Sequence, residues 1–144
     1  MERMDSLTDE KTRVKIMDDC GHSCAKVNKK LIDGAKVRRK KYKTDDEFLQ
    51  AEQRKPISGT RLIRDGDVLC QYYTPRAFTK PMRCYCSLLR GLPEDEQVSG
   101  TYCHCSKSFV KEFWDSVLEK AVKVELLQSA VSGASECKFA IRLW

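Results

Sequence analysis

The residues of this chain that are best suited to chemistry are its cysteines, because six of the eight fall in three close pairs. The pairs are Cys20 with Cys24, Cys84 with Cys86, and Cys103 with Cys105. Both histidines of the chain, His22 and His104, lie inside the first and the last pair. Two thiolates separated by one to three residues can bind one metal ion or act as redox partners. The spacing matches no standard zinc-finger pattern, so it indicates thiol-dependent chemistry without naming a reaction.

One use of these pairs is a metal site. A closed zinc site needs four ligands at about 2.0–2.3 Å from the metal, so two cysteine pairs that meet in space could provide it. Zinc is the first expectation because it binds thiolates without redox demands, an iron–sulfur cluster is the second, and the third possibility is that no metal is bound. The candidate metal ligands are Cys20, Cys24, Cys84, Cys86, Cys103 and Cys105.

The other use is catalysis. In a cysteine enzyme, Cys103 or Cys105 would be the nucleophile, and His104 or His22 would assist as the base. Phosphate loops, dinucleotide-binding glycine fingerprints and paired-carboxylate hydrolase patterns are missing from the sequence, which excludes those classes. Whether the protein is an enzyme is left open by the residues.

The elements that must position these residues divide the chain into a helical part, residues 1–56, and a part with a sheet and one long helix, residues 57–144. We expect one α+β domain: a helical N-terminal layer followed by an antiparallel sheet packed by one long amphipathic helix. Helices are predicted near residues 8–19 and 23–32, with Cys20 and Cys24 at their junction. Gly21 would allow an unusual backbone conformation at that junction.

The next elements follow from capping, turn and periodicity signals. A capping box at Thr44 starts a third helix, and Asp65-Gly66 predicts a hairpin with a type I′ turn. Residues 82–89 would form a strand that carries Cys84 and Cys86 on one face. The apolar stripe over residues 106–120 predicts the long helix, and residues 122–131 and 137–143 predict a closing hairpin.

The third cysteine pair is expected directly before the long helix. A thiol at a helix N-terminus lies at the positive end of the helix dipole, which favours the thiolate. The two remaining cysteines, Cys70 and Cys137, are interpreted as core residues of strands.

Composition and charge limit the class of protein. At 144 residues and 41% hydrophobic, the chain can form one ordinary globular domain. Residues 1–13 are dense with charge, and no stretch approaches the roughly 18–20 apolar residues of a membrane span, so we expect a soluble cytoplasmic protein with reduced thiols. Residues 29–43 contain eight basic residues and one acid. This basic segment could bind nucleic acid, although a solvated surface explains it more simply.

The motifs around the cysteine pairs resemble those of an uncharacterised family of small bacterial cysteine-rich proteins. They are Cys20-Gly-His-Ser-Cys24-Ala, Cys84-Tyr-Cys86-Ser and Gly100-Thr-Tyr-Cys-His-Cys-Ser106. The resemblance covers most of the chain and implies no activity.

A more distant similarity concerns the end of the chain, with its long helix, its Val-Lys-Val-Glu strand, a Ser-Gly turn and Glu136-Cys137-Lys-Phe139-Ala-Ile141. This order is similar to the C-terminal half of 4-vinyl-reductase-type ligand-binding domains and to the aminothiazoline-carboxylate hydrolase group. The first similarity implies a small-molecule pocket between sheet and helix, with Cys137 near it. The second implies hydrolysis of a small C–N or C–S substrate.

Together these observations favour a cysteine-rich small-ligand-binding or metal-binding domain that acts as a sensor. A cysteine-dependent hydrolase is the alternative, and nucleic-acid binding through residues 29–43 is the third hypothesis. The ligand, the oligomeric state and the set of cysteines that meet in space do not follow from the sequence.

Overall fold

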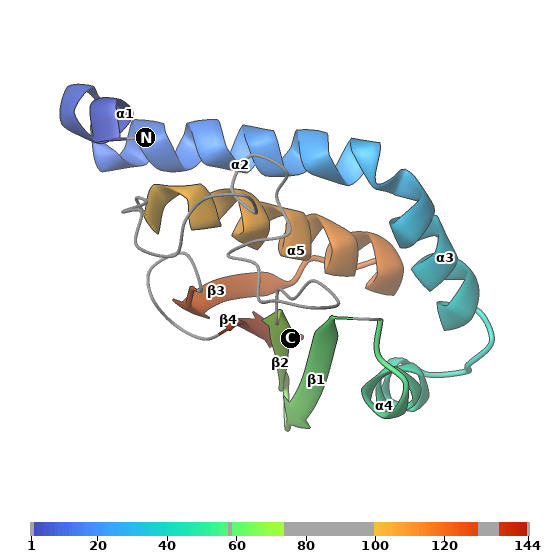
Figure 1. The fold of residues 1–144 in the computed structure, drawn as a ribbon. Coiled ribbons are helices and arrows are strands. Elements are labelled where there is room, and N and C mark those ends of the chain that lie inside the picture. The colour runs from blue at the N-terminus through green and yellow to red at the C-terminus, as the bar shows by residue number, and fades with distance from the viewer. Residues whose placement is uncertain (1, 58, 74–99, 130–135, 144) are drawn as a thin grey trace, which may run out of the picture.

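A computed structural model describes residues 2–57, 59–73, 100–129 and 136–143 of the chain. It is an α+β fold, as predicted, with the helical N-terminal segment followed by an antiparallel sheet and one long helix (Figure 1). The helices are α1 (Glu2–Leu7), α2 (Glu10–Val27), α3 (Lys29–Arg39), α4 (Asp45–Arg54) and α5 (Cys103–Leu118). The strands are β1 (Thr60–Asp65), β2 (Val68–Tyr73), β3 (Lys123–Gln128) and β4 (Cys137–Arg142).

The four strands form one sheet in the order β1-β2-β4-β3, and every neighbouring pair is antiparallel. Helix α5 packs against the sheet, and α2 packs on α5 from the side away from the sheet (Figure 1). Helices α3 and α4 continue from α2 toward β1, since α3 contacts α5 and α4 contacts β1. Helix α5 is therefore the middle layer between α2 and the sheet.

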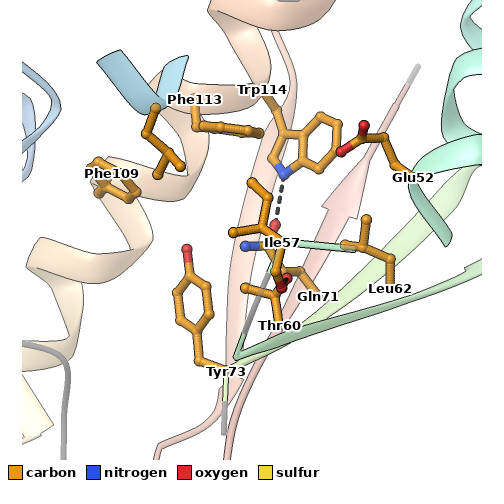
Figure 2. A pocket seen from close by; sticks show the side chains of 10 residues that line it. Glu52, Ile57, Thr60, Leu62, Gln71, Tyr73, Phe109, Phe113 and Trp114 are labelled. Carbon is orange, nitrogen blue, oxygen red and sulfur yellow. Dashed lines mark hydrogen bonds between the residues drawn. The ribbon is translucent and has the colours of Figure 1, made fainter. Parts of the chain in front are cut away.

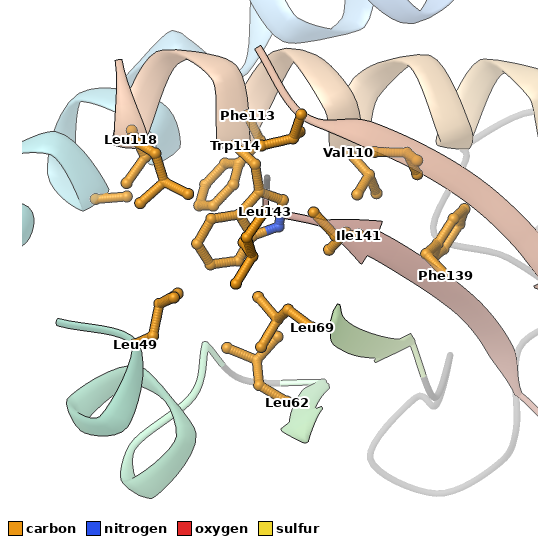
Figure 3. Packing of buried hydrophobic residues seen from close by; sticks show 14 of the residues in the cluster. Leu49, Leu62, Leu69, Val110, Phe113, Trp114, Leu118, Phe139, Ile141 and Leu143 are labelled. Carbon is orange, nitrogen blue, oxygen red and sulfur yellow. The ribbon is translucent and has the colours of Figure 1, made fainter. Parts of the chain in front are cut away.

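The hydrophobic core lies between α5 and the sheet (Figure 3). Alternate residues of β4 and the residue after it face the core: Cys137, Phe139, Ile141 and Leu143 are all buried, as the period-2 pattern predicts. Ala140 of β4 is buried as well. Helix α5 contributes Val110, Phe113, Trp114 and Val117 from its apolar stripe. The indole Nε1 of Trp114 donates a hydrogen bond of 2.7 Å to Oε1 of the buried Gln71 on β2.

The predicted break between the first two helices is wrong in position. Helix α2 continues through Cys20, Gly21 and Cys24 and ends at Val27. Asn28 caps it, and the side-chain amide of Asn28 donates a hydrogen bond to the carbonyl of Cys24. A single glycine costs a helix only about 1 kcal/mol, and packing against α5 can offset that cost. Helix α3 runs through Gly34 to Arg39, beyond residue 32, where the second predicted helix ends.

Two other boundaries differ from the sequence prediction. The hairpin between β1 and β2 is present, but its central residues are Gly66 and Asp67, because Asp65 pairs with Val68. Gly66 has a φ of +60°, and Asp67 is not among the residues with positive φ, which is the pattern of a type II′ turn rather than type I′.

Helix α5 begins three residues earlier than predicted, after a short 3-10 turn over Gly100–Tyr102. Cys103, His104 and Cys105 are therefore its first three residues and do not precede it.

The closing hairpin is confirmed by the antiparallel pairing of β3 with β4. The strand predicted over residues 82–89, with Cys84 and Cys86, lies outside the described residues. Over the described part of the chain, none of the helices combines the length and the apolar composition that a membrane span requires.

Candidate thiol site

One cysteine of the first pair and one of the third meet where α2 packs on α5. The Sγ atoms of Cys24 and Cys105 are 3.9 Å apart, although the two residues are 81 positions apart in the sequence. Cys24 is exposed and Cys105 is partly exposed. The two thiols therefore form a pair that small molecules and ions in solution can reach.

Gly21 brings the two helices close together beside this thiol pair. A Cβ atom at Gly21 would lie 2.5 Å from the backbone oxygen of Cys105 and 2.5 Å from Cβ of Ser108. Ser108 is buried, and its hydroxyl donates a hydrogen bond of 2.9 Å to the carbonyl of Asp18. The glycine is thus needed for close approach of the backbones, and the expected unusual conformation is absent, because Gly21 is not among the residues with positive φ.

The distance between the two sulfur atoms allows two kinds of chemistry. A tetrahedral metal with metal–sulfur bonds of about 2.3 Å separates two of its thiolates by about 3.8 Å. A disulfide bond is about 2.05 Å long, so the two sulfur atoms would have to approach by about 1.9 Å to form one. No group of three or more Cys, His, Asp or Glu side chains with metal-binding geometry exists among the described residues.

The other paired cysteines lie elsewhere. Cys103 is buried, and its Sγ lies 2.6 Å from the hydroxyl oxygen of Ser129, which follows β3. Residues two apart on a helix point about 200° away from each other, so Cys103 and Cys105 face different neighbours. Cys20 is exposed one turn before Cys24 on α2. Cys84 and Cys86 lie outside the described residues.

The two cysteines outside the three sequence pairs, Cys70 and Cys137, differ in burial. Cys137 is buried at the start of β4, as expected for a core residue. Cys70 is only partly buried. It alternates along β2 with Leu69 and Gln71, which face the core, so Cys70 lies on the opposite face of the sheet.

The two histidines have different surroundings. Nδ1 of His22 lies 3.1 Å from a carboxylate oxygen of Glu112, which links α2 to α5 a second time near the thiol pair. Nδ1 of His104 is buried and has no hydrogen-bond partner in the part of the chain that the structure describes. A carboxylate on Nδ1 can orient a histidine base, but among the described residues no hydrogen bond joins His22 to a cysteine thiol.

Part of the basic segment, residues 29–43, is engaged within the protein. Lys29 pairs with Asp33, Arg38 with Glu52 at 2.8 Å, and Arg39 with Asp45 at 2.8 Å. Asp45 also accepts a hydrogen bond of 2.9 Å from Lys120. Burial alone would raise the pKa of Asp45, but the hydrogen bonds and charges of Lys120 and Arg39 outweigh burial and hold the pKa below its usual value. The pairs of Arg38 with Glu52 and of Arg39 with Asp45 tie α3 to α4, and together with Lys29–Asp33 they reduce the charge that the segment presents to a nucleic acid.

A small cavity of about 50 Å³ opens beside the core (Figure 2). That volume has room for a few water molecules, whereas typical sites for drug-sized ligands measure about 300–1,000 Å³. Phe109 and Phe113, one and two turns after Cys105 on α5, form part of its wall. The lining residues are Leu31, Glu52, Ile57, Thr60, Leu62, Gln71, Tyr73, Phe109, Phe113 and Trp114.

Comparison with known proteins assigns the chain to a family. A family described as "Family of unknown function (DUF6144)" matches residues 1–143. The chain belongs to this family. No curated protein and no solved structure matches it significantly. The expected similarity to an uncharacterised family thus holds for this DUF6144 protein, whereas the similarities to 4-vinyl-reductase-type domains and to the hydrolase group receive no support.

Sequence reasoning missed the residues that bring the thiol pair together. Gly21 and Ala25 are both buried and lie one turn apart on α2, which is the pattern of small residues where two helices approach closely. Ser108 lies one turn after Cys105 on the facing helix and is also buried. This pattern of small residues is the signal in the sequence that could have located the contact.

Proposed function

We propose that this DUF6144 protein binds a zinc ion through cysteine thiolates, with Cys24 and Cys105 as two of the ligands, and works as a sensor domain. The observation that carries the proposal is the 3.9 Å separation of the two sulfur atoms. It is close to the roughly 3.8 Å between two thiolates on a tetrahedral zinc ion. The two ligands come from different helices, so binding of the metal would link α2 to α5.

The remaining ligands are a prediction from the sequence. Cys84 and Cys86 form the second close pair, and they would complete a site with four thiolates. Cys20 is the weaker candidate: it is exposed one turn before Cys24 on the same helix, but it forms no three-residue metal-binding group with Cys24 and Cys105 in the described structure. Zinc is preferred over an iron–sulfur cluster because it accepts thiolate ligands without a redox requirement.

The sensor role is supported by the position of the small cavity. Phe109 and Phe113 form part of its wall and belong to the same helix as Cys105. The cavity has room only for a few water molecules, so a small-molecule ligand would have to widen it and displace α5, the helix that carries Cys105. Ligand binding and metal binding would then influence each other through one helix.

The test is the metal content of the protein purified under reducing conditions without a metal-affinity column. We expect about one equivalent of zinc per chain, and its loss in Cys24→Ser and in Cys105→Ser. Cys70→Ser is the control, because Cys70 lies on the opposite face of the sheet and should keep the metal. Cys20→Ser and Cys84→Ser then decide which residue completes the site. Wild-type protein without zinc or iron would refute the proposal.

A cysteine-dependent hydrolase stays the alternative prediction. It requires Cys103 or Cys105 to be alkylated much faster than the other thiols at neutral pH. Uniform slow labelling of all cysteines would exclude it, and the same protein preparation serves for this measurement.

A further inference from the structure

We infer that Cys24 and Cys105 are a redox modification site, at which oxidation forms a disulfide between α2 and α5. The inference adds regulation to the proposed zinc site and takes its biological role from that site. The chemistry itself needs only the two thiols, which lie 3.9 Å apart.

The position of the two residues favours this disulfide. The sulfur atoms must approach by about 1.9 Å, a movement that rotation of the cysteine side chains can contribute while the helix backbones stay in place. Gly21 keeps those backbones close, since there is no room for even a Cβ atom between it and Cys105. Cys24 is exposed, so an oxidant in solution can reach it.

The other cysteines of the described chain are less suited to pair with Cys24. Cys20 lies on the same helix, one turn away, so a disulfide between them would have to form along one helix surface. The thiol of Cys103 is buried against Ser129. Cys70 and Cys137 belong to strands of the sheet. Among the cysteines that the structure describes, the geometry therefore selects Cys105 as the partner.

The reaction is thiol–disulfide exchange with a small-molecule disulfide such as oxidised glutathione. The thiolate of Cys24 attacks one sulfur of the reagent, the disulfide bond of the reagent breaks, and one glutathione thiolate leaves. The thiolate of Cys105 then attacks Sγ of Cys24 and expels the second glutathione thiolate. Two protein thiols are oxidised, one glutathione disulfide is reduced to two thiols, and the protons of the protein thiols pass to solvent or to the leaving thiolates.

Oxidation and metal binding exclude each other at this site. Zinc is bound by thiolates, and sulfur atoms joined in a disulfide are no longer thiolates. Formation of the disulfide would therefore release the metal, and bound zinc would protect both cysteines from oxidation.

The experiment treats the full chain with oxidised glutathione, once as purified and once after removal of metal by a chelator. Peptide mapping without reductant should recover a Cys24–Cys105 cross-linked peptide from the chelated protein, and dithiothreitol should reverse it. Cys20→Ser should give the same cross-link, because Cys20 does not take part. In Cys105→Ser, Cys24 should stay as a mixed disulfide with glutathione.

The outcomes separate this inference from the proposed function. Zinc release together with the cross-link supports both. A cross-link in a protein that never contains metal supports the redox site and refutes the zinc site. A chelated wild-type protein that forms no Cys24–Cys105 peptide, or that joins Cys24 to a different cysteine, overturns the redox site whatever its metal content.

Discussion

The contact at Gly21 gives the sharpest prediction, because the structure contains a matched control. Gly21 and Gly34 are both glycines inside helices. In Gly21→Ala the new Cβ would lie 2.5 Å from the backbone oxygen of Cys105 and from Cβ of Ser108. In Gly34→Ala the nearest atom is the end of the flexible Arg38 side chain, at 3.7 Å.

The expected magnitudes follow from these distances. Carbon atoms in contact are normally separated by about 3.5–4.0 Å, so α2 and α5 must move apart by about 1 Å to accept the added methyl group of Gly21→Ala. Overpacking of this kind costs about 1–3 kcal/mol, and the upper end applies because backbone must move. Alanine recovers about 1 kcal/mol through its helix propensity. We expect a net loss of about 2 kcal/mol for Gly21→Ala and a gain of up to about 1 kcal/mol for Gly34→Ala.

Urea unfolding of the two variants beside the wild-type protein, under reducing conditions, measures both changes in the free energy of unfolding. The difference between the variants should be about 2–3 kcal/mol. If Gly21→Ala proves as stable as Gly34→Ala, then α2 and α5 are not held at the distance described, and the close approach of Cys24 and Cys105 is refuted as well.

Two further substitutions test interactions away from the thiol pair. Asp45→Asn should lower the free energy of unfolding by up to about 1 kcal/mol at pH 7, because it removes ion pairs with Arg39 and Lys120. Folding lowers the pKa of Asp45 from 3.8. The extra free energy of unfolding of the wild-type protein should therefore be fully present above pH 3.8 and disappear as the pH falls through the lower pKa of the folded state. Urea unfolding at several pH values measures this difference. Trp114→Phe should cost about 2–3 kcal/mol in the same assay at pH 7, because it leaves the buried Gln71 oxygen without its donor and creates a small cavity.

The sequence predicted those elements whose signals are local. Thr44 caps α4 with its hydroxyl, which accepts a hydrogen bond from the backbone nitrogen of Glu47, as the capping box predicts. The alternation in β4 and the apolar stripe of α5 identified the two surfaces that form the core. Each of these signals acts within a few residues, so no knowledge of the tertiary structure was needed to read it.

The end of the first helix was predicted too early, because the contact that decides it is with a distant part of the chain. Gly21 was expected to adopt an unusual backbone conformation at the junction of two helices, because glycine has that freedom and also weakens a helix. In the folded protein it lies against Cys105 and Ser108 of a helix more than eighty residues later, and this contact is what requires a glycine. The low helix propensity of glycine acts within α2, whereas the close packing that requires glycine involves α5. Only the first of these effects can be recognised from the neighbouring sequence.

The cysteine pairs mislead for a related reason. Neighbours in a C-x-C motif can bind one centre from a loop, but once Cys103 and Cys105 enter a helix they point about 200° apart. The third pair is therefore divided between Ser129 and Cys24. The start of α5 decided this division, and the sequence prediction placed that start three residues too late.

The thiol spacing and the packing of the two helices depend on the same contact, which makes them testable together. A tetrahedral metal and a disulfide each tolerate only a narrow range of sulfur separations, about 3.8 Å and 2.05 Å. If Gly21→Ala moves α2 about 1 Å away from α5, the 3.9 Å separation of Cys24 and Cys105 lengthens, and zinc content and disulfide yield should both fall. Gly34→Ala should change neither of them. A Gly21→Ala protein that loses stability but keeps its zinc and its cross-link would show that the thiols find each other without the close contact of the helices.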